Sequence, residues 1–395
     1  MMVPKLRFKE FTNKWCECLL GNLVDIKSGN SPSTYELSSE GNYPFVKVED
    51  MNNCTKYQID AREYVINSQF CFPAGSIIFP KRGAAIMNNK VRILNQNSCA
   101  DTNMMALIAT SIKPEFLYYL VNLIGLYKIA DTSTIPQINN KHILSFKVNI
   151  PSEEEQTKIA DFLSSVDEKI TLLNQQYDLL CQYKKGMMQN IFSQELRFKD
   201  DSGDEFPGWE EVELKKIASK VNTKNRDNSV TAVLTNSATQ GIVSQESYFE
   251  REIVTESNLT GYYVVRTGDF VYNPRISSTA PVGPIKMNEL TQGVMSPLYT
   301  VFRFEKGLLK FYQYFFESSV WHDYMKSVAN SGARHDRMNI SGADFFGLPV
   351  PQPFEAEQTK IANVLSALDN KIAVKKAELD KLKTWKQGLL QQMFV

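Results

Sequence analysis

Two long stretches of the chain carry apolar residues at alternating steps of four and three positions. They lie at 151–194 and 353–395. This spacing is the 3.5-residue repeat of a coiled coil, so each stretch predicts one helix of about 38 residues, roughly 57 Å long. The residues of the two predicted seams are Ile159, Leu163, Val166, Ile170, Leu173, Tyr177, Leu180, Ile361, Leu365, Leu368, Ile372, Leu379, Leu382 and Leu389.

Each predicted helix also carries signals at its start and within its seam. Pro151 and Pro353 stand just before the helices, where proline is tolerated. A helix of this length with one apolar seam needs a partner, so we expect the two copies to pair as an antiparallel coiled coil. The alternative is two amphipathic helices, each packed on its own domain. Lys184 and Lys386 interrupt the seams at equivalent positions, where a polar residue either sets the register or extends to the surface.

The two stretches belong to an internal duplication. The motif Glu-Gln-Thr-Lys-Ile-Ala stands at 155–160 and again at 357–362, an offset of 202 residues. Eleven of the sixteen positions from 155 onward are identical to those from 357 onward. A shorter repeat, Leu-Arg-Phe-Lys followed by a tryptophan, opens each half at 6–9 and 196–199. The duplication therefore predicts two modules that do the same kind of work.

The regions between these repeats, about 24–150 and 218–352, share almost no sequence with each other. Their patterns predict mixed α/β (α+β) structure, with strands at 75–79 and 268–272. Apolar helices are predicted at 114–129 and 308–328, and we interpret these as core helices. The fold class is thus two mixed strand-and-helix domains, separated by two long helices and related by a pseudo-twofold repeat.

Composition restricts the location and chemistry of the protein. Among 395 residues, lysines and arginines number 44, equal to the aspartates and glutamates, and no apolar run is long enough to cross a membrane. The polar N-terminal residues do not resemble a signal peptide, so we expect a cytoplasmic protein. The six cysteines and three histidines lack zinc-ligand spacing, and we expect reduced thiols and no metal site.

Polar and basic loops are the candidate binding sites. Two follow the predicted strands at 75–79 and 268–272, and two precede the long helices. Arginine, lysine, asparagine and glutamine can contact base edges in the major groove, while serine, threonine and lysine can hold phosphates. The candidate DNA-binding residues are Lys81, Arg82, Thr134, Gln137, Asn139, Asn140, Lys141, Asn273, Arg275, Ser277, Ser278, Arg334, His335, Arg337 and Asn339.

The repeated helix start and the repeated opener resemble the specificity subunit of type I restriction–modification systems. The resemblance covers nearly the whole chain, in the order variable module, shared helix, variable module, shared helix. It implies target-recognition domains at 1–150 and 195–352, and spacer helices at 151–194 and 353–395. It does not identify base-reading residues, because the recognition domains of this family diverge widely.

The resemblance also implies partners. Each recognition domain would read one half of a split, asymmetric site in double-stranded DNA, and the helices would fix the gap between the halves. Two methyltransferase subunits would dock on the helices and methylate adenine at N6, and motor-nuclease subunits would join for restriction. Cofactors would bind those partners: S-adenosylmethionine for methylation, and ATP with magnesium for restriction.

The chain itself lacks recognisable catalytic motifs. It contains no ATP-binding phosphate loop, no Asn/Asp-Pro-Pro-aromatic motif of adenine methyltransferases and no evident catalytic triad. We therefore expect a non-catalytic subunit. Two other hypotheses remain at this point. A coiled-coil scaffold would bind no DNA, whereas an unconventional stand-alone methyltransferase or nuclease would act on DNA without partners.

Overall fold

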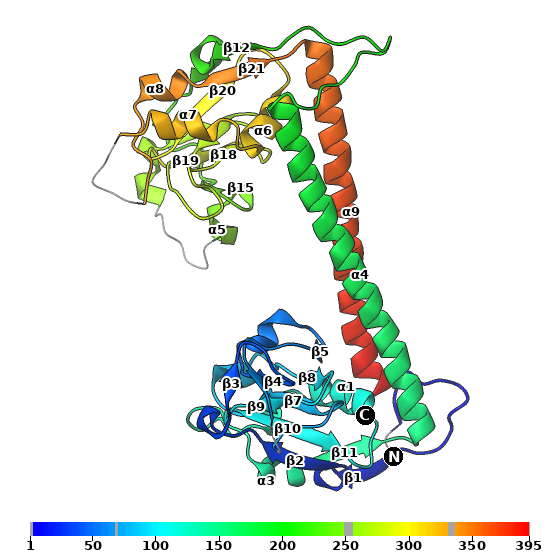
Figure 1. Ribbon diagram of the computed structural model, residues 1–395. Coiled ribbons are helices and arrows are strands. Elements are labelled where there is room, and N and C mark those ends of the chain that lie inside the picture. The colour runs from blue at the N-terminus through cyan, green and yellow to red at the C-terminus, as the bar shows by residue number, and fades with distance from the viewer. Residues whose placement is uncertain (1–2, 68–69, 249–255, 331–335, 395) are drawn as a thin grey trace. The chain divides into compact units, whose positions relative to one another are not determined.

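The chain folds into two compact units in a computed structural model that describes residues 3–67, 70–248, 256–330 and 336–394 (Figure 1). Unit 1 combines Met1–Asn174 with Ala377–Val395, and unit 2 is Gln175–Lys376. Each unit therefore contains one variable module and half of each long helix. We refer to residues 24–150 as module 1 and to residues 218–352 as module 2.

The two long helices have the predicted extent. Helix α4 (Glu153–Phe192) has 40 residues and α9 (Glu355–Met393) has 39. All fourteen predicted seam residues are buried or half-buried. In unit 1, Leu163 and Val166 of α4 share a core with Leu389 and Met393 of α9. The start of one helix thus packs beside the end of the other.

Unit 2 repeats this arrangement with the roles of the helices exchanged. Ile361 and Leu365, near the start of α9, share a core with Met188 and Ile191, near the end of α4. The helices are therefore antiparallel in each unit, as the fold prediction requires. The helices also pack on the modules. Each long helix therefore contacts both the other long helix and the module cores, so both of the packing arrangements considered from the sequence are present.

A phenylalanine at the end of each helix inserts into a module core. Phe394, just after α9, stacks on Phe116 with ring centroids 5.0 Å apart in unit 1. Phe192, the last residue of α4, lies 5.5 Å from Phe311 in unit 2. The duplication pairs Phe192 with Phe394, so equivalent residues anchor the two helix ends.

Module 1 is built on a five-stranded sheet in the order β2-β10-β7-β8-β5, with helix α1 (Pro114–Ile124) against it. The strands are β2 (Val24–Ser28), β10 (Met104–Ala109), β7 (Ile77–Pro80), β8 (Arg92–Leu94) and β5 (Tyr57–Gln58). A second sheet contains β3 (Leu37–Ser38), β6 (Tyr64–Val65), β4 (Tyr43–Val46) and β9 (Cys99–Ala100). The remaining elements are β1 (Cys16–Leu19), β11 (Lys147–Ile150), α2 (Leu126–Ile129) and α3 (Asn140–Leu144).

Module 2 has a corresponding four-stranded sheet in the order β13-β20-β17-β18, with α6 (Leu309–Glu317) beside it. The strands are β13 (Ala218–Lys220), β20 (Thr300–Phe304), β17 (Phe270–Tyr272) and β18 (Ile285–Met287). Two-stranded sheets pair β12 (Glu210–Glu213) with β21 (Pro349–Gln352), β14 (Leu234–Ser237) with β15 (Gly241–Ser244), and β16 (Tyr263–Val265) with β19 (Gly293–Met295). The short helices are α5 (Gln245–Tyr248), α7 (His322–Ser327) and α8 (Gly342–Phe346).

The predicted strands at 75–79 and 268–272 become β7 and β17, which lie inside their sheets. Gly75 and Gly268 precede them with φ values of 82° and 88°, a conformation that glycine adopts without strain. The predicted core helix at 114–129 is divided into α1 and α2, because Gly125 between them also has a positive φ. The predicted helix at 308–328 is similarly divided into α6 and α7.

One prediction about the cysteines is wrong. A disulfide joins Cys71 and Cys99, whereas we expected six reduced thiols. The physical reason is a local antiparallel bridge in which Phe72 and Ser98 exchange backbone hydrogen bonds of 2.8 and 3.0 Å. This bridge places their neighbours, Cys71 and Cys99, opposite each other with Cα atoms 4.3 Å apart. The other four cysteines are free thiols.

Among the residues that the structure describes, none of the helices combines the length and apolar character needed to cross a bilayer.

Candidate nucleic-acid interface

In module 1, the two loops predicted to bind DNA pair with each other. The loop after β7 contributes Lys81 and Gly83, and the loop before α3 contributes Pro136 and Ile138. The backbone N–H of Ile138 donates to the carbonyl of Lys81 at 2.9 Å, and the N–H of Gly83 donates to the carbonyl of Pro136 at 2.9 Å. These bonds join two segments that lie far apart in the sequence into one surface.

The side chains of this loop pair differ in how freely they can reach a ligand. Arg82 and Thr134 are exposed, as are Asn140 and Lys141 at the start of α3, whereas Gln137 is half-buried. Lys81 is also half-buried, and burial together with the charge of Arg82 lowers the pKa of its ammonium group. Arg82, Thr134, Asn140 and Lys141 are therefore the candidates of this loop pair whose side chains are most open to solvent.

Two of the module 1 candidates have a structural role. Asn139 is the residue just before α3. Its backbone N–H donates to Nδ1 of His142 at 3.3 Å, and this bond stabilises the first turn of the helix. The backbone of Gln137 exchanges hydrogen bonds with Asp131 at 2.9 and 3.0 Å and so closes the loop at 131–137. These contacts shape the loop that presents Thr134.

Module 2 repeats the loop pairing with different residues. The segment after β17 pairs with the segment before α8, through an antiparallel bridge between Arg275 and Arg337. The N–H of Ile276 donates to the carbonyl of Asp336 at 3.1 Å, and the N–H of Met338 donates to that of Pro274 at 2.8 Å. Both modules thus bring the same two segments together.

The candidate side chains of module 2 also differ in their exposure to solvent. Arg275, Ser277, Ser278 and Asn339 are exposed. Arg337 is half-buried, and its Nε lies 3.6 Å from a carboxylate oxygen of Asp336. The hydroxyl of Ser277 accepts a hydrogen bond from the N–H of Ala280 at 3.1 Å, so it shapes a turn.

Asn273 has a different place from the one predicted. It is buried, its amide nitrogen donates to the carbonyl of Asn236 at 3.0 Å, and its amide oxygen accepts from the N–H of Arg275 at 3.0 Å. Since these bonds use its amide within the protein, Asn273 supports the loop rather than facing a ligand. Arg334 and His335 lie outside the described residues.

The repeated motifs attach each module to its helix. Glu155 is buried and accepts hydrogen bonds from Nε and Nη2 of Arg7, both at 2.7 Å, and from the indole of Trp15 at 3.3 Å. The equivalent Glu357 accepts two bonds of 2.9 Å from Arg197 and one of 2.8 Å from Trp209. The hydrogen bond to Glu155 and its negative charge raise the pKa of Arg7.

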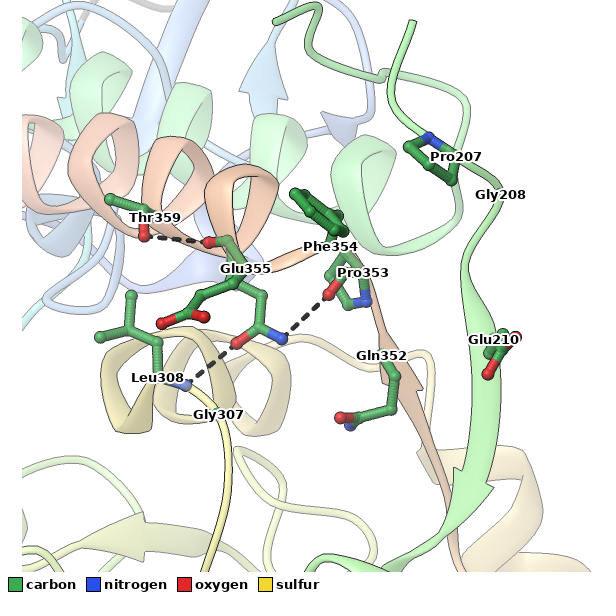
Figure 2. Close-up of a pocket in the computed structure, with 11 residues that line it drawn as sticks. Pro207, Gly208, Glu210, Gly307, Leu308, Gln352, Pro353, Phe354, Glu355 and Thr359 are labelled. Atoms are coloured by element: carbon green, nitrogen blue, oxygen red, sulfur yellow. Dashed lines mark hydrogen bonds between the residues drawn. The ribbon is translucent and has the colours of Figure 1, made fainter.

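The glutamine that follows each glutamate joins the helix start to the module. The side-chain oxygen of Gln358 accepts from the N–H of Leu308 at 3.0 Å, and its nitrogen donates to the carbonyl of Pro353 at 3.0 Å (Figure 2). Gln156 makes the same two bonds, to Lys113 and Pro151. Sequence reasoning found these motifs by their repetition but did not predict that they act as attachment points.

Figure 2 shows a cleft beside this attachment in unit 2. Its volume is about 540 Å³, and its lining includes Pro207, Glu210, Phe354 and Thr359. Both polar ends of Gln358, which also lines the cleft, are bonded within the protein. In the described part of the chain, no group of three histidine, cysteine, aspartate or glutamate side chains could hold a metal ion.

Comparisons with known proteins agree with this architecture. Residues 13–182 and 207–384 each match the type I restriction modification DNA specificity domain. The chain is 24% identical to the type I restriction enzyme MjaVIII specificity subunit of Methanocaldococcus jannaschii, over 95% of this chain and 91% of that protein. It is 26% identical to the putative MjaX specificity subunit of the same organism, over 71% and 67%.

Solved structures share the fold. The specificity subunit of the type I system from M. genitalium has a TM-score of 0.55 at 16% identity, over 100% of this chain and 99% of that chain. A chain from a type I restriction–modification system, solved to explain complex assembly and conformational transition, has a TM-score of 0.60 at 15% identity over 98% of both chains. Because the family domain matches most of the chain in two copies, this protein belongs to the specificity subunits of type I restriction–modification systems, which recognise DNA sequence.

Proposed function

We propose that modules 1 and 2 each read one half of a split, asymmetric DNA site, and that α4 and α9 fix the gap between the halves. The observation that carries this proposal is the recurrence of one loop pair, with different side chains, at the same place in both modules. Module 1 presents Arg82, Thr134 and Lys141, and module 2 presents Arg275 and Ser278. Equivalent surfaces with unlike residues suit two unlike targets.

We expect single arginine variants to weaken recognition of one half-site and spare the other. Arg82→Ala should weaken binding by about 1–3 kcal/mol, roughly five- to 150-fold, if its guanidinium contacts a base edge. The loss should disappear on DNA whose module 1 half-site is scrambled. Arg275→Ala and Arg337→Ala should show the same behaviour for the module 2 half-site.

The measurement is binding of the methyltransferase-associated chain to duplexes in which one half-site at a time is scrambled, at a fixed salt concentration. Arg62→Ala is the matched control, since Arg62 is an exposed arginine of module 1 outside the loop pair. Equal losses on both half-sites would indicate phosphate contacts only. No loss from any of the three variants would reject this loop pair as the reading surface.

The helices further suit the docking of two copies of one partner, a methyltransferase subunit. Large apolar side chains are exposed at positions related by the duplication: Leu172 and Val374 are 52% and 65% exposed, and Tyr183 and Trp385 are 56% and 48% exposed. Unit 1 thus carries Leu172 with Trp385, and unit 2 carries Val374 with Tyr183. We propose that each of these pairs belongs to one apolar patch per unit, because exposed apolar patches mark interaction sites.

Leu172→Glu is expected to reduce the bound methyltransferase from two copies to one, because it places a charge in one of the two equivalent patches. Val374→Glu should remove the other copy, and the double variant should bind none. Native mass spectrometry of the mixed subunits measures the stoichiometry. Leu144→Glu, an exposed leucine of unit 1 outside the long helices, is the control. Two bound copies in the double variant would contradict the proposed docking surface.

The chemistry would belong to the partners. In this proposal the chain supplies recognition, the methyltransferase subunits bind S-adenosylmethionine and methylate adenine, and motor-nuclease subunits use ATP and magnesium.

A further inference from the structure

The two lysines that interrupt the helix seams each bind an aspartate of the other long helix. In unit 1, Nζ of Lys386 in α9 lies 2.5 Å from Oδ1 of Asp167 in α4. In unit 2, Nζ of Lys184 in α4 lies 2.6 Å from Oδ1 of Asp369 in α9. The lysine side chains are only 23% and 14% exposed. Each helix therefore contributes one lysine and one aspartate to two reciprocal ion pairs.

Each aspartate also accepts a hydrogen bond from a buried tyrosine of a module. The hydroxyl of Tyr119 in α1 donates to Oδ2 of Asp167 at 2.7 Å, and the hydroxyl of Tyr314 in α6 donates to Oδ2 of Asp369 at 2.6 Å. Ser164 and Ser366 lie within 3.4 and 3.0 Å of these hydroxyls. Each Lys–Asp–Tyr cluster thus joins three elements at one point: both long helices and the module's core helix.

Other charged groups complete each cluster. In unit 1, Nζ of Lys56 bonds to Tyr119 at 3.2 Å and to Ser164 at 2.7 Å, and pairs with Glu115 at 2.5 Å. In unit 2, Glu317 lies 3.0 Å from Nζ of Lys184. Burial alone would lower the pKa of Lys184, but Glu317 and Asp369 outweigh it and raise that pKa. The lysine is therefore held in its charged form.

The clusters define one register of the helix pair. In two antiparallel helices with a constant register, the numbers of facing residues always add up to the same total. The pairs Asp167–Lys386 and Lys184–Asp369 have the same total. Nζ of Lys376 lies 5.8 Å from the ring centroid of Tyr177, and this pair of residues has the same total again. A slip of one heptad would move the charges apart by about 10.5 Å and leave these partly buried charges without their partners.

From this geometry we infer that Tyr119, Asp167 and Lys386, with Tyr314, Asp369 and Lys184, are positioning residues that determine how sharply the spacer between half-sites is selected. The inference rests on the proposed function, in which the helices set that spacer. Each cluster holds the helices in register and holds a module's core helix at a fixed place on them. Buried polar residues often specify one arrangement rather than add stability, which separates this role from a merely structural one.

The test uses the full chain with its methyltransferase partner and duplexes that carry both half-sites with spacers of varied length. The Tyr119→Phe/Tyr314→Phe variant removes two hydroxyls and leaves the packing in place. We expect the ratio of methylation rates, cognate spacer over spacers one base pair longer or shorter, to fall five- to tenfold. The rate on the cognate spacer should change less than twofold. Tyr118→Phe, a neighbouring buried tyrosine outside the cluster's hydrogen bonds, is the control.

A second pair of variants tests the charges. Lys184→Met/Lys386→Met should lower the same ratio at least tenfold, and Lys184→Arg/Lys386→Arg should keep it within twofold of the unchanged protein. If the tyrosine variant melts at a lower temperature but keeps an unchanged ratio of methylation rates between spacers, the inference is overturned. This result would count whether or not the methionine variant folds. If the unchanged protein itself shows no preference for spacer length, the proposed function fails instead.

Discussion

Replacing Glu357 by glutamine is expected to lower the free energy of unfolding of unit 2 by about 2–4 kcal/mol. The side chain of Glu357 is fully buried and accepts hydrogen bonds from Arg197 and Trp209. A glutamine would remove the negative charge. Its amide nitrogen, a donor, would replace one accepting oxygen and would face the N–H donors of Arg197 and Trp209. Arg197, whose side chain is only 27% exposed, would then lack its counter-charge.

Urea-induced unfolding followed by tryptophan fluorescence measures this change. Glu355→Gln is the matched control, because Glu355 stands in the same helical turn but is exposed, and it should cost less than about 1 kcal/mol. Glu155→Gln should destabilise unit 1 by a similar amount through Arg7 and Trp15. If Glu357→Gln unfolds at the same urea concentration as Glu355→Gln, the attachment role of the repeated motif is wrong.

Lengthening both long helices by one heptad is expected to lengthen the preferred spacer by about three base pairs. Seven residues add roughly 10.5 Å to a helix, and stacked base pairs rise about 3.4 Å each. The insertion should duplicate residues 171–177 in α4 and 373–379 in α9. These segments lie between the aspartate and the lysine of each helix, so both ion pairs keep their partners and the seam keeps its period.

The matched control lengthens α4 alone. That variant cannot form both ion pairs with uninterrupted helices, so we expect weak methylation without a new, sharply preferred spacer. Rates on duplexes of graded spacer length measure both variants. A doubly lengthened protein that still prefers the original spacer would contradict the spacing role of the helices, while the reading role of the modules could stand.

The helices were predictable because their signal is local and repeated. Apolar residues such as Leu163 and Leu365 recur every 3.5 residues, and that period alone defines a long helix with one buried stripe. Lys184 and Lys386 stood out for the same reason, as polar residues in apolar positions. The strands β7 and β17 were predictable from short apolar runs that begin after a glycine.

The attachment of the modules was not predictable, because it depends on residues far apart in the chain. Arg7 meets Glu155 across 148 positions, and Tyr314 meets Asp369 across 55. No local pattern reports such contacts. The same reason explains the disulfide between Cys71 and Cys99, and the pairing of the loops around Arg82 and Gln137.

Asn273 was predicted to contact DNA but has a structural place in the fold. Its residue type and its loop position both suit contact with a base, yet the fold buries it against Asn236. A polar residue directly after a central strand is as suitable for closing the loop as for reading DNA. Exposure, which decides between these roles, follows from tertiary structure alone.

The most direct test of the central claim is a map of methylated adenines in DNA from a host that carries this chain with its methyltransferase partner. We predict a single asymmetric motif made of two specified blocks, separated by an unspecified gap of constant length. Exchange of module 2 for that of a relative should change one block and leave the other block intact. One continuous motif, or a module exchange that alters both blocks, would contradict the account.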